Sequence, residues 1–261
     1  MNETGLVVEQ MTLPETVYPA HDERPAIKDM QWIQYMLDTC STVNEVCLAA
    51  SDLRIAQSTA PLHYMVCDQN GEAAIIEYLE GRLICYTRER LPFAISTNSS
   101  YRDSLAYYHG TLPNPANNPY TQNSLKRFTQ SVAFVEDIPA EADLNFELAF
   151  GILDSVKRED TTWQIIYNLR EMRIYWKKQP YWLTQTIDFK RFDFTKNETS
   201  KVIHPASADH NGEVSIFDYS LQHNRDLAEK FFRNEALSQV LNLKVTEEML
   251  DYFAGYPEQM K

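Results

Sequence analysis

Glycine is scarce in this chain, and its scarcity excludes several kinds of site. Only 7 of the 261 residues are glycine. No two of them lie close enough to form the G-x-G-x-x-G loop of dinucleotide sites, a phosphate-binding P-loop or the G-x-S-x-G turn of serine hydrolases. Long apolar runs are also missing, since none approaches the ~18 residues of a membrane span, and no signal-peptide pattern opens the chain. We therefore expect neither a nucleotide cofactor nor a membrane-spanning segment.

Cysteine and histidine are too sparse for the common disulfide and metal frameworks. The four cysteines are Cys40, Cys47, Cys67 and Cys85. They contain no C-x-x-C pair, which excludes zinc ribbons and thioredoxin-like motifs. Cys67 and Cys85 fall in strand-like runs, where buried free thiols are expected. His204 and His210 suggest metal ligands, but no H-E-x-x-H motif is present, and we predict no metal and no cofactor.

Basic residues are outnumbered, which restricts the partners of the chain. There are 24 Lys and Arg against 37 Asp and Glu, a formal net charge of −13. This charge is repelled by nucleic-acid backbones and anionic membranes, so we predict no nucleic-acid partner. The hydrophobic content of 44% and the aromatic content of 12% are those of a globular protein, which excludes general disorder.

Hydrophobic periodicity predicts two helices followed by an antiparallel meander. Pro25 suits a first helical position, and Ala26 starts a helical spacing of apolar residues that continues over the following turns. Thr42 and Glu45 form a capping box for a second helix. Three short strands follow, at residues 62–67, 73–79 and 83–87. The turns between these strands contain glycines typical of hairpins.

The second half of the chain repeats the order of helices and then strands. A short helix is predicted at residues 100–108, with Ser100 and Asp103 as its capping pair. Longer helices are predicted at 125–135 and 144–156, and a second meander at 162–169, 172–177 and 182–189. The chain is then polar to about residue 213, and two amphipathic helices follow near 221–234 and 246–253. Two meanders with associated helices indicate two sheets packed face to face with helices outside.

Taken one by one, the polar residues of the strands give weak signals of chemistry. His63 and Cys67 share one strand face, but side chains four residues apart on an extended strand are too distant for a direct hydrogen bond. Glu77 and Glu80 fit solvated strand ends and turns better than a glycosidase pair.

Five segments of the sequence carry a stronger signal when they are taken together. They are "MNETGLVVEQMTLPETVYP", "QWIQYMLDTCSTVNEV", "APLHYMVCDQNGEAAIIEYLEGRLICYT", "ISTNSSYRDSLAYY" and "TTWQIIYNLREMRIYW". In this order they resemble successive blocks of the choloylglycine hydrolase family, in the branch of linear amide C–N hydrolases. The resemblance runs from residue 1 to about residue 195 and implies an N-terminal-nucleophile hydrolase. We therefore predict an α+β fold, an αββα sandwich of two antiparallel sheets, as a single domain over residues 1–261.

The resemblance implies cleavage of a linear amide by a cysteine at the mature N-terminus. The thiolate attacks the amide carbonyl, the chain's own α-amino group is the base, and water releases the acid from an acyl-enzyme. An α-amino group suits this role because its ordinary pKa is about 8. Hydrogen-bond donors must meet the developing oxyanion. We expect the acyl side of the pocket to be apolar and aromatic, which 15 Tyr and 12 Phe allow.

The resemblance also indicates site residues. In isolation Asn98 is typical of a helix N-terminal cap, and Arg127 of a solvated helix arginine. By resemblance, Asn98 in "STNSSY" matches the oxyanion-stabilising asparagine of the family's "TNSP" block, with Ser99-Ser100 in place of Ser-Pro. Arg127 in "LKRF" matches the arginine of the family's "SRF" block, near the nucleophile, and we predict both residues as catalytic. Thr12 is predicted to bind substrate, but it stands where bile-salt hydrolases have asparagine and penicillin V acylases have tyrosine, so it favours neither substrate class.

The N-terminal block leaves the nucleophile unassigned. In the family, "MNE-x-GL" is internal and follows a segment that begins with the nucleophilic cysteine, whereas here removal of Met1 would expose Asn2. We expect that the chain is N-terminally truncated, contains no nucleophile and is inactive as written, with residues 5–11 beside an unpaired sheet edge. A start site assigned too far downstream, a truncated gene and a remnant with another use are the three explanations, and we favour the first two.

Two functions stay open on the sequence alone. The first is an amidase-family protein that cleaves a small-molecule acyl amide when a cysteine-led segment precedes residue 1. The second is a non-catalytic remnant, a binding or assembly protein on the same fold. The oligomeric state is also open, with a homo-oligomer among the options because family members are often tetramers. The compartment is cytoplasmic by default, or periplasmic if a preceding segment carries an export signal.

Overall fold

The structure is a computed structural model that describes residues 1–56, 60–115, 117–139, 141–142, 145–180, 182–195, 200–208, 212, 214–234 and 245–258. The chain divides into two units, Met1–Arg191 and Phe192–Lys261. The expectation of a single domain over residues 1–261 stays a prediction.

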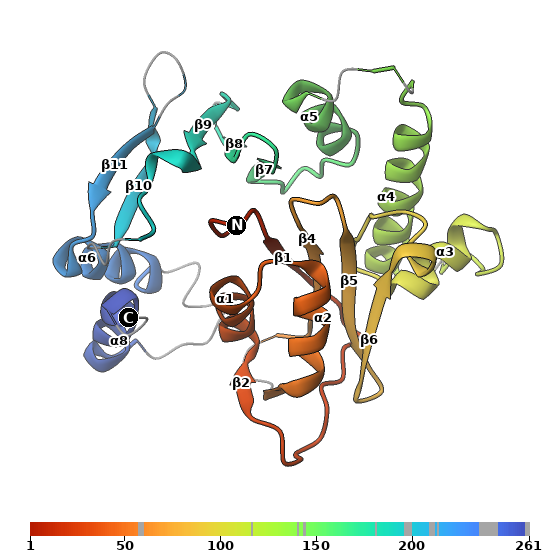
Figure 1. The fold of residues 1–261 in the computed structure, drawn as a ribbon, viewed down its shortest axis with the longest axis horizontal. Coiled ribbons are helices and arrows are strands. Elements are labelled where there is room, and N and C mark those ends of the chain that lie inside the picture. The colour runs from red at the N-terminus through yellow and green to blue at the C-terminus, as the bar shows by residue number, and fades with distance from the viewer. Residues whose placement is uncertain are drawn as a thin grey trace. The chain divides into compact units, whose positions relative to one another are not determined.

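A four-stranded antiparallel sheet in the order β1-β4-β5-β6 lies at the centre of the first unit (Figure 1). Its strands are β1 (Val7–Thr12), β4 (Leu62–Cys67), β5 (Ala73–Leu79) and β6 (Arg82–Thr87), so the first predicted meander is confirmed. Its two hairpin turns place Gly71 at φ 83° and Gly81 at φ 77°, a region that glycine adopts without steric cost. Within the described residues β1 pairs only with β4, so it is an edge strand.

Two helices, α1 (Asp29–Thr39) and α2 (Val43–Asp52), cover one face of this sheet (Figure 1). Their apolar residues form one buried cluster with the sheet, in which the rings of Trp32 and Tyr64 stack with centroids 4.2 Å apart. The predicted capping box of α2 is present. The Thr42 hydroxyl accepts a hydrogen bond from the Glu45 N–H, and the Glu45 carboxylate accepts one from the Thr42 N–H.

The predicted start of the first helix is wrong. Residues Ala26–Lys28 form strand β2, which pairs in parallel with β3 (Arg54–Ala56). Ile27 faces Ile55 in this pairing, and Ile55 is buried. The helical spacing after Pro25 did not reveal the strand, because a partner distant in sequence supplies its hydrogen bonds.

A second antiparallel sheet faces the first within this unit. It contains β7 (Trp163–Asn168), β8 (Arg173–Lys178) and β9 (Gln185–Asp188), as the second predicted meander requires. Tyr167 of β7 donates a hydrogen bond to Glu9 of β1, which joins the two sheets. Helix α5 (Phe146–Ser155) packs on the opposite face of the second sheet, where Phe146 stacks on Tyr175. These layers confirm the predicted α+β sandwich of antiparallel sheets flanked by helices; Leu144, at the predicted start of α5, lies outside the described residues.

Helices α3 (Tyr101–Tyr108) and α4 (Pro119–Glu136) pack together against β5. Their buried contacts with the sheet come from Ile75, Leu91, Tyr101, Phe128 and Val132. Helix α3 agrees with the prediction. Helix α4 begins earlier than its apolar stripe suggested, because Asn118 caps it and Pro119 occupies the first turn.

The second unit contains a β-hairpin and two helices. The hairpin strands are β10 (Lys201–Ala208) and β11 (Val214–Asp218), and the helices are α6 (Leu221–Phe232) and α8 (Glu247–Gly255). Both helices were predicted, whereas β10 lies in the stretch expected to be a polar tail. Short 3₁₀ turns complete the two units, at η1 (Arg88–Arg90), η2 (Phe189–Arg191) and η3 (Tyr256–Glu258).

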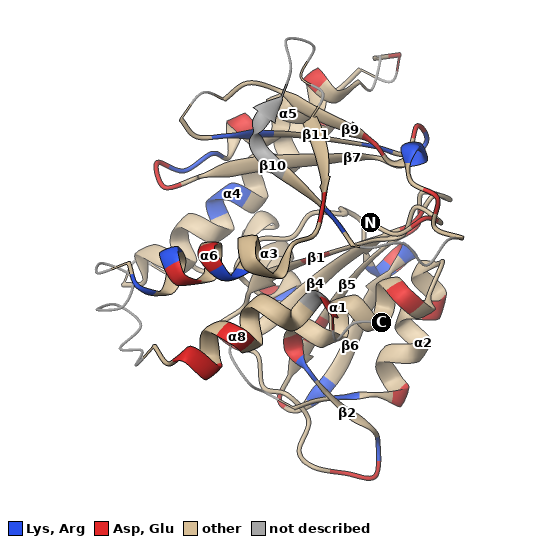
Figure 2. Cartoon of the chain, turned by 90° about the vertical axis from the view of Figure 1, so that its left-hand side faces the viewer, with Lys and Arg blue, Asp and Glu red and all other residues tan. Residues whose placement is uncertain are grey.

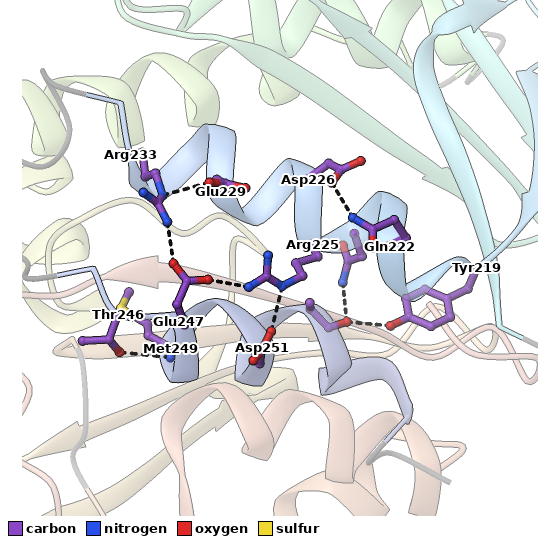
Figure 3. A network of polar contacts seen from close by, with 12 residues as sticks. Tyr219, Gln222, Arg225, Asp226, Glu229, Arg233, Thr246, Glu247, Met249 and Asp251 are labelled. Atoms are coloured by element: carbon purple, nitrogen blue, oxygen red, sulfur yellow. Dashed lines mark hydrogen bonds and ion pairs between the residues drawn. The ribbon is translucent and has the colours of Figure 1, made fainter.

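Ion pairs join α6 to α8 (Figure 3). Arg225 Nε donates to Asp251 at 2.7 Å, and Arg225 Nη2 donates to Glu247 at 2.5 Å. Arg233 Nη2 reaches the other oxygen of Glu247 at 2.6 Å. The hydrogen bonds to Asp251 and then Glu247 raise the pKa of Arg225, so one guanidinium stays charged between two carboxylates of the facing helix.

Acidic residues dominate some of the helices. Helices α2 and α8 carry Asp and Glu but no Lys or Arg (Figure 2). In the described part of the chain, no helix combines the length and the apolar character needed to cross a lipid bilayer.

Candidate active site

The three residues that the family resemblance indicated lie together in the first unit. Thr12 ends β1, Asn98 lies in the loop before α3, and Arg127 lies within α4. Asn98 Nδ2 donates a hydrogen bond of 2.9 Å to the Thr12 carbonyl oxygen. Arg127 Nη2 donates one of 2.8 Å to Asn98 Oδ1. The fold thus joins Asn98 to one residue 86 positions away and to another 29 positions away.

Asn98 is not the cap of α3. That role belongs to Ser100, whose hydroxyl accepts a hydrogen bond from the Asp103 N–H at 3.3 Å. The Asn98 amide is therefore used for contacts with β1 and α4 instead. Because a guanidinium can only donate hydrogen bonds, Arg127 requires the amide oxygen to face α4, and the amide nitrogen then faces β1.

Arg127 is half-buried, so it is not the solvated arginine that its position in isolation suggested. Its Nε donates to Asn123 Oδ1 at 3.0 Å, one turn earlier on α4. Burial lowers the pKa of the guanidinium, and the nearby charge of Arg158 lowers it further. The group remains charged near neutral pH because the ordinary pKa of arginine lies above about 12. The site therefore contains a partly desolvated positive charge.

Three hydroxyl groups tie the Asn98 loop to α4. Ser99 Oγ donates to Ser124 Oγ at 2.9 Å, and Ser124 Oγ donates to Thr97 Oγ1 at 3.1 Å. All three side chains are buried. Ser124 lies one turn before Arg127 on α4, so the residues on both sides of Asn98 are fastened to the helix that carries its arginine partner.

A buried carboxylate, Glu77 of β5, holds the start of α3. Glu77 Oε1 accepts a hydrogen bond of 2.7 Å from the Tyr101 N–H and lies 3.3 Å from His63 Nδ1. Glu77 and His63 have no exposed surface. The expectation that Glu77 and Glu80 belong to a solvated strand end is therefore wrong for Glu77. A buried polar group needs such partners, and these anchor the helix that follows Asn98.

An open hollow of about 630 Å³ adjoins Arg127. Its walls come from α4, including Tyr120 and Asn123, and from residues 155–160, which are the last residue of α5 and the five that follow it. Most of this lining is polar or charged, and Arg158 forms two hydrogen bonds with Asp160, of 2.7 and 2.8 Å. Tyr120 is the one aromatic residue in this lining, so the hollow is more polar than the expected acyl-binding surface, and that surface stays a prediction.

The thiols of the chain lie outside this arrangement. Burial raises the pKa of the Cys40 thiol, and it raises the pKa of Cys67 to about 11. Cys67 and Cys85 are free, as expected, but they are half-buried rather than buried. Cys85 lines a separate hollow together with Cys47 elsewhere in the unit. Among the residues that the structure describes, none supplies a thiol to Asn98 or Arg127.

Potential metal ligands are also dispersed. No group of three or more His, Cys, Asp or Glu suitable for a metal ion occurs among the residues that could be searched. His210 and the side chain of His204 lie outside the described part of the chain. The expectation that the chain binds no metal therefore stays a prediction.

The residues that support Asn98 were missed in the sequence. Asn123 had a partial signal. It stands four residues before Arg127, a spacing at which side chains on one helix meet, but it precedes the helix predicted at 125–135. The hydroxyl groups of Thr97, Ser99 and Ser124 and the carboxylate of Glu77 had no sequence signal, because they connect elements that are far apart in sequence.

Comparison with known proteins identifies the family of the chain. Residues 1–141 match the family model described as linear amide C-N hydrolases, choloylglycine hydrolase family. This range covers more than half of the 261 residues and includes Thr12, Asn98 and Arg127. The chain belongs to the choloylglycine hydrolase family, and the predicted resemblance is confirmed.

Particular relatives are similar in sequence or in structure. Penicillin V acylase of Pectobacterium atrosepticum is 26% identical over 153 residues, which are 53% of this chain and 40% of that protein; the chain thus spans less than half the length of this relative. The structure of penicillin V acylase from Agrobacterium tumefaciens matches with a TM-score of 0.62 and 23% identity, over 84% of this chain and 70% of that one. A conjugated bile acid hydrolase variant from Clostridium perfringens gives a TM-score of 0.61 and 18% identity, over 84% and 76%. These structural matches establish the fold.

Proposed function

We propose that this chain supplies the oxyanion-stabilising part of an active site that hydrolyses small-molecule acyl amides. The observation that carries the proposal is the position of Asn98, whose amide is held by the Thr12 carbonyl on one side and by Arg127 on the other. Membership of a family of linear amide C-N hydrolases supports it.

In this proposal, Asn98 donates a hydrogen bond to the oxyanion. Its Nδ2 carries two hydrogens, and one of them is used on the Thr12 carbonyl oxygen. The other has no partner among the described residues. It is available for the oxygen that becomes negative when a thiolate attacks the amide carbonyl. Because Arg127 already fixes the amide, the donor needs no reorientation during the reaction.

Arg127 and Thr12 position Asn98 in different ways. The charged hydrogen bond from Arg127 polarises the Asn98 amide, which makes its N–H groups better donors. Thr12 contributes its backbone carbonyl, and its exposed side chain is free to contact a substrate.

The nucleophile in this proposal is a cysteine from outside these 261 residues. Cys40 and Cys67 are poor candidates because burial raises their pKa values. Strand β1 has a free side in the described structure, and Thr12 at its end contacts Asn98. A cysteine-led segment that adds to this edge would bring its thiol to the oxyanion donor.

The same free edge favours a second candidate function. An unpaired strand can accept a strand of another chain, so β1 also suits a non-catalytic binding or assembly protein. This alternative requires no nucleophile.

An extended chain separates the two functions. The segment that precedes the matching block in the Pectobacterium penicillin V acylase is fused before Met1, and hydrolysis of penicillin V and other acyl amides is followed by release of the amine. The amidase proposal predicts turnover by the extended chain, and no turnover when its first cysteine is replaced by alanine. An extended chain that folds, as judged by circular dichroism, but hydrolyses none of these amides contradicts it and leaves the binding function.

A further inference from the structure

Two of the four cysteines lie on the face of the first sheet that α1 and α2 cover. Cys47 belongs to α2 and Cys85 to β6, and the helix packs against the strand. Both side chains line one hollow, and a hydrogen-bonding interaction between the thiols shifts the pKa of each. Both side chains pack against the same buried apolar cluster, and both remain partly exposed.

This thiol pair lines a hollow of about 370 Å³, distinct from the one beside Arg127. Its other walls include Asp68 and Glu72 of the β4–β5 turn and Arg88 after β6. A small molecule that enters the hollow therefore meets both thiols at its wall.

The two thiols differ in acidity. The hydrogen bond from Cys85 lowers the pKa of Cys47, because it stabilises the Cys47 thiolate. The same bond, together with burial, raises the pKa of Cys85. Cys47 is therefore the first of the pair to ionise and the better nucleophile, and Cys85 stands beside it.

We propose that Cys47 and Cys85 are a redox-active dithiol site that reacts with low-molecular-weight disulfides and closes into a disulfide bond between α2 and β6. The site uses neither Asn98 nor Arg127, so it does not depend on the proposed amide hydrolysis.

The reaction consists of two thiol–disulfide exchanges. The Cys47 thiolate attacks one sulfur of the small disulfide, a mixed disulfide forms, and the first half leaves as a thiolate that takes up the proton lost by Cys47. Cys85 then loses its proton and attacks Cys47 Sγ, and the second half leaves and is protonated. The two protein thiols lose two electrons, and the small disulfide becomes two thiols.

Oxidised glutathione is the probe for the test. The native chain is incubated with it, free thiols are counted after denaturation, and linked peptides are identified by mass spectrometry without reduction. The proposal predicts that two of the four thiols disappear, that one cross-link joins Cys47 to Cys85, and that dithiothreitol restores both. Loss of Cys40 or Cys67 instead, or glutathione on Cys47 with no cross-link, would overturn it.

Three single variants assign the steps. Cys85→Ser should stop at a stable mixed disulfide on Cys47, and Cys47→Ser should react at least about tenfold more slowly, because the activated thiolate is gone. Cys67→Ser is the matched control, since Cys67 lies on β4 outside this hollow, and it should form the cross-link at the wild-type rate. Equal reactivity of Cys47→Ser and the wild type contradicts the proposal. If a variant folds poorly, the peptide map of the unaltered chain still shows whether a disulfide bond joins Cys47 to Cys85, and its absence overturns the proposal.

Discussion

At the scale of single residues, the orientation of the Asn98 amide determines whether the site offers a hydrogen-bond donor to an oxyanion. Asn98 presents its nitrogen toward β1 because Arg127 occupies its oxygen. An oxyanion needs a donor, so the opposite orientation would place an acceptor where negative charge develops. The guanidinium therefore contributes to the proposed chemistry through Asn98 rather than through a contact of its own.

The proposed role of Asn98 predicts a specific loss in the extended, cysteine-led chain. Asn98→Ala should lower kcat by about 10²–10³-fold and leave KM nearly unchanged, because the donor acts on the transition state. Arg127→Gln should lower kcat less, since the amide remains but is no longer held. Steady-state kinetics provides the measurement, and Lys126→Ala, at an exposed neighbouring position on α4, is the control. An unchanged kcat in Asn98→Ala would show that the role is wrong.

Glu77 should be important for stability rather than for chemistry. Glu77→Ala removes the acceptor of the Tyr101 N–H and the partner of His63, so the free energy of unfolding should fall by about 3 kcal/mol. Glu77→Gln should cost less, because its side-chain oxygen can still accept the Tyr101 hydrogen bond. Urea denaturation measures both changes, with the exposed Glu89→Ala as control. Equal losses in Glu77→Gln and Glu77→Ala would contradict this account.

At the scale of elements, those with local signals were predicted and those held by distant partners were not. The start of α2 follows from Thr42 and Glu45, and the β5–β6 hairpin follows from Gly81, because each feature depends on neighbouring residues. Strand β2 was predicted as helix, since its hydrogen bonds come from β3. Strand β10 was missed because Val202 and Ile203 stand in a longer stretch that is mostly polar, and its pairing with β11 is visible only in the structure.

The pair of helices α6 and α8 should depend on Arg225. Arg225→Ala removes the ion pairs with Asp251 and Glu247, so protease cleavage within residues 221–255 should become several-fold faster. The difference from wild type should shrink at high salt, because these exposed pairs are screened. Lys230→Ala, at an exposed position of α6, is the control. Cleavage of Arg225→Ala at the wild-type rate in low salt would argue against this dependence.

At the scale of the whole first unit, the proposed disulfide would join the outer helix layer to the central sheet. Closing this loop should stabilise the oxidised form by about 3–4 kcal/mol if the effect is that of chain entropy. The melting temperature of the oxidised chain should therefore exceed that of the reduced chain. Calorimetry of both forms measures the shift, which should persist in Cys67→Ser and vanish in Cys85→Ser. If the melting temperature of Cys85→Ser still rises on oxidation, the Cys47–Cys85 disulfide is not the cause of the stabilisation.

The residues of the candidate site were predictable, but their contacts were not. Thr12, Asn98 and Arg127 were predicted because each stands in a short block that resembles a family pattern, and such blocks can be read along the chain. The hydrogen bond from Ser99 to Ser124 and the hydrogen bond from the Tyr101 N–H to Glu77 join segments that are far apart in sequence. Only packing of the sheet against α3 and α4 brings these groups together.

By itself, the sequence determined the kind of elements, most of their order and the family to which the chain belongs, because hydrophobic period, capping residues and turn glycines act over a few neighbouring positions. The tertiary structure alone decided that Arg127 orients Asn98, that Glu77 is buried beside His63 and that Cys47 meets Cys85. Each of these contacts joins residues from different elements. It exists only after chain entropy has been lost in bringing distant segments together, which no local pattern records.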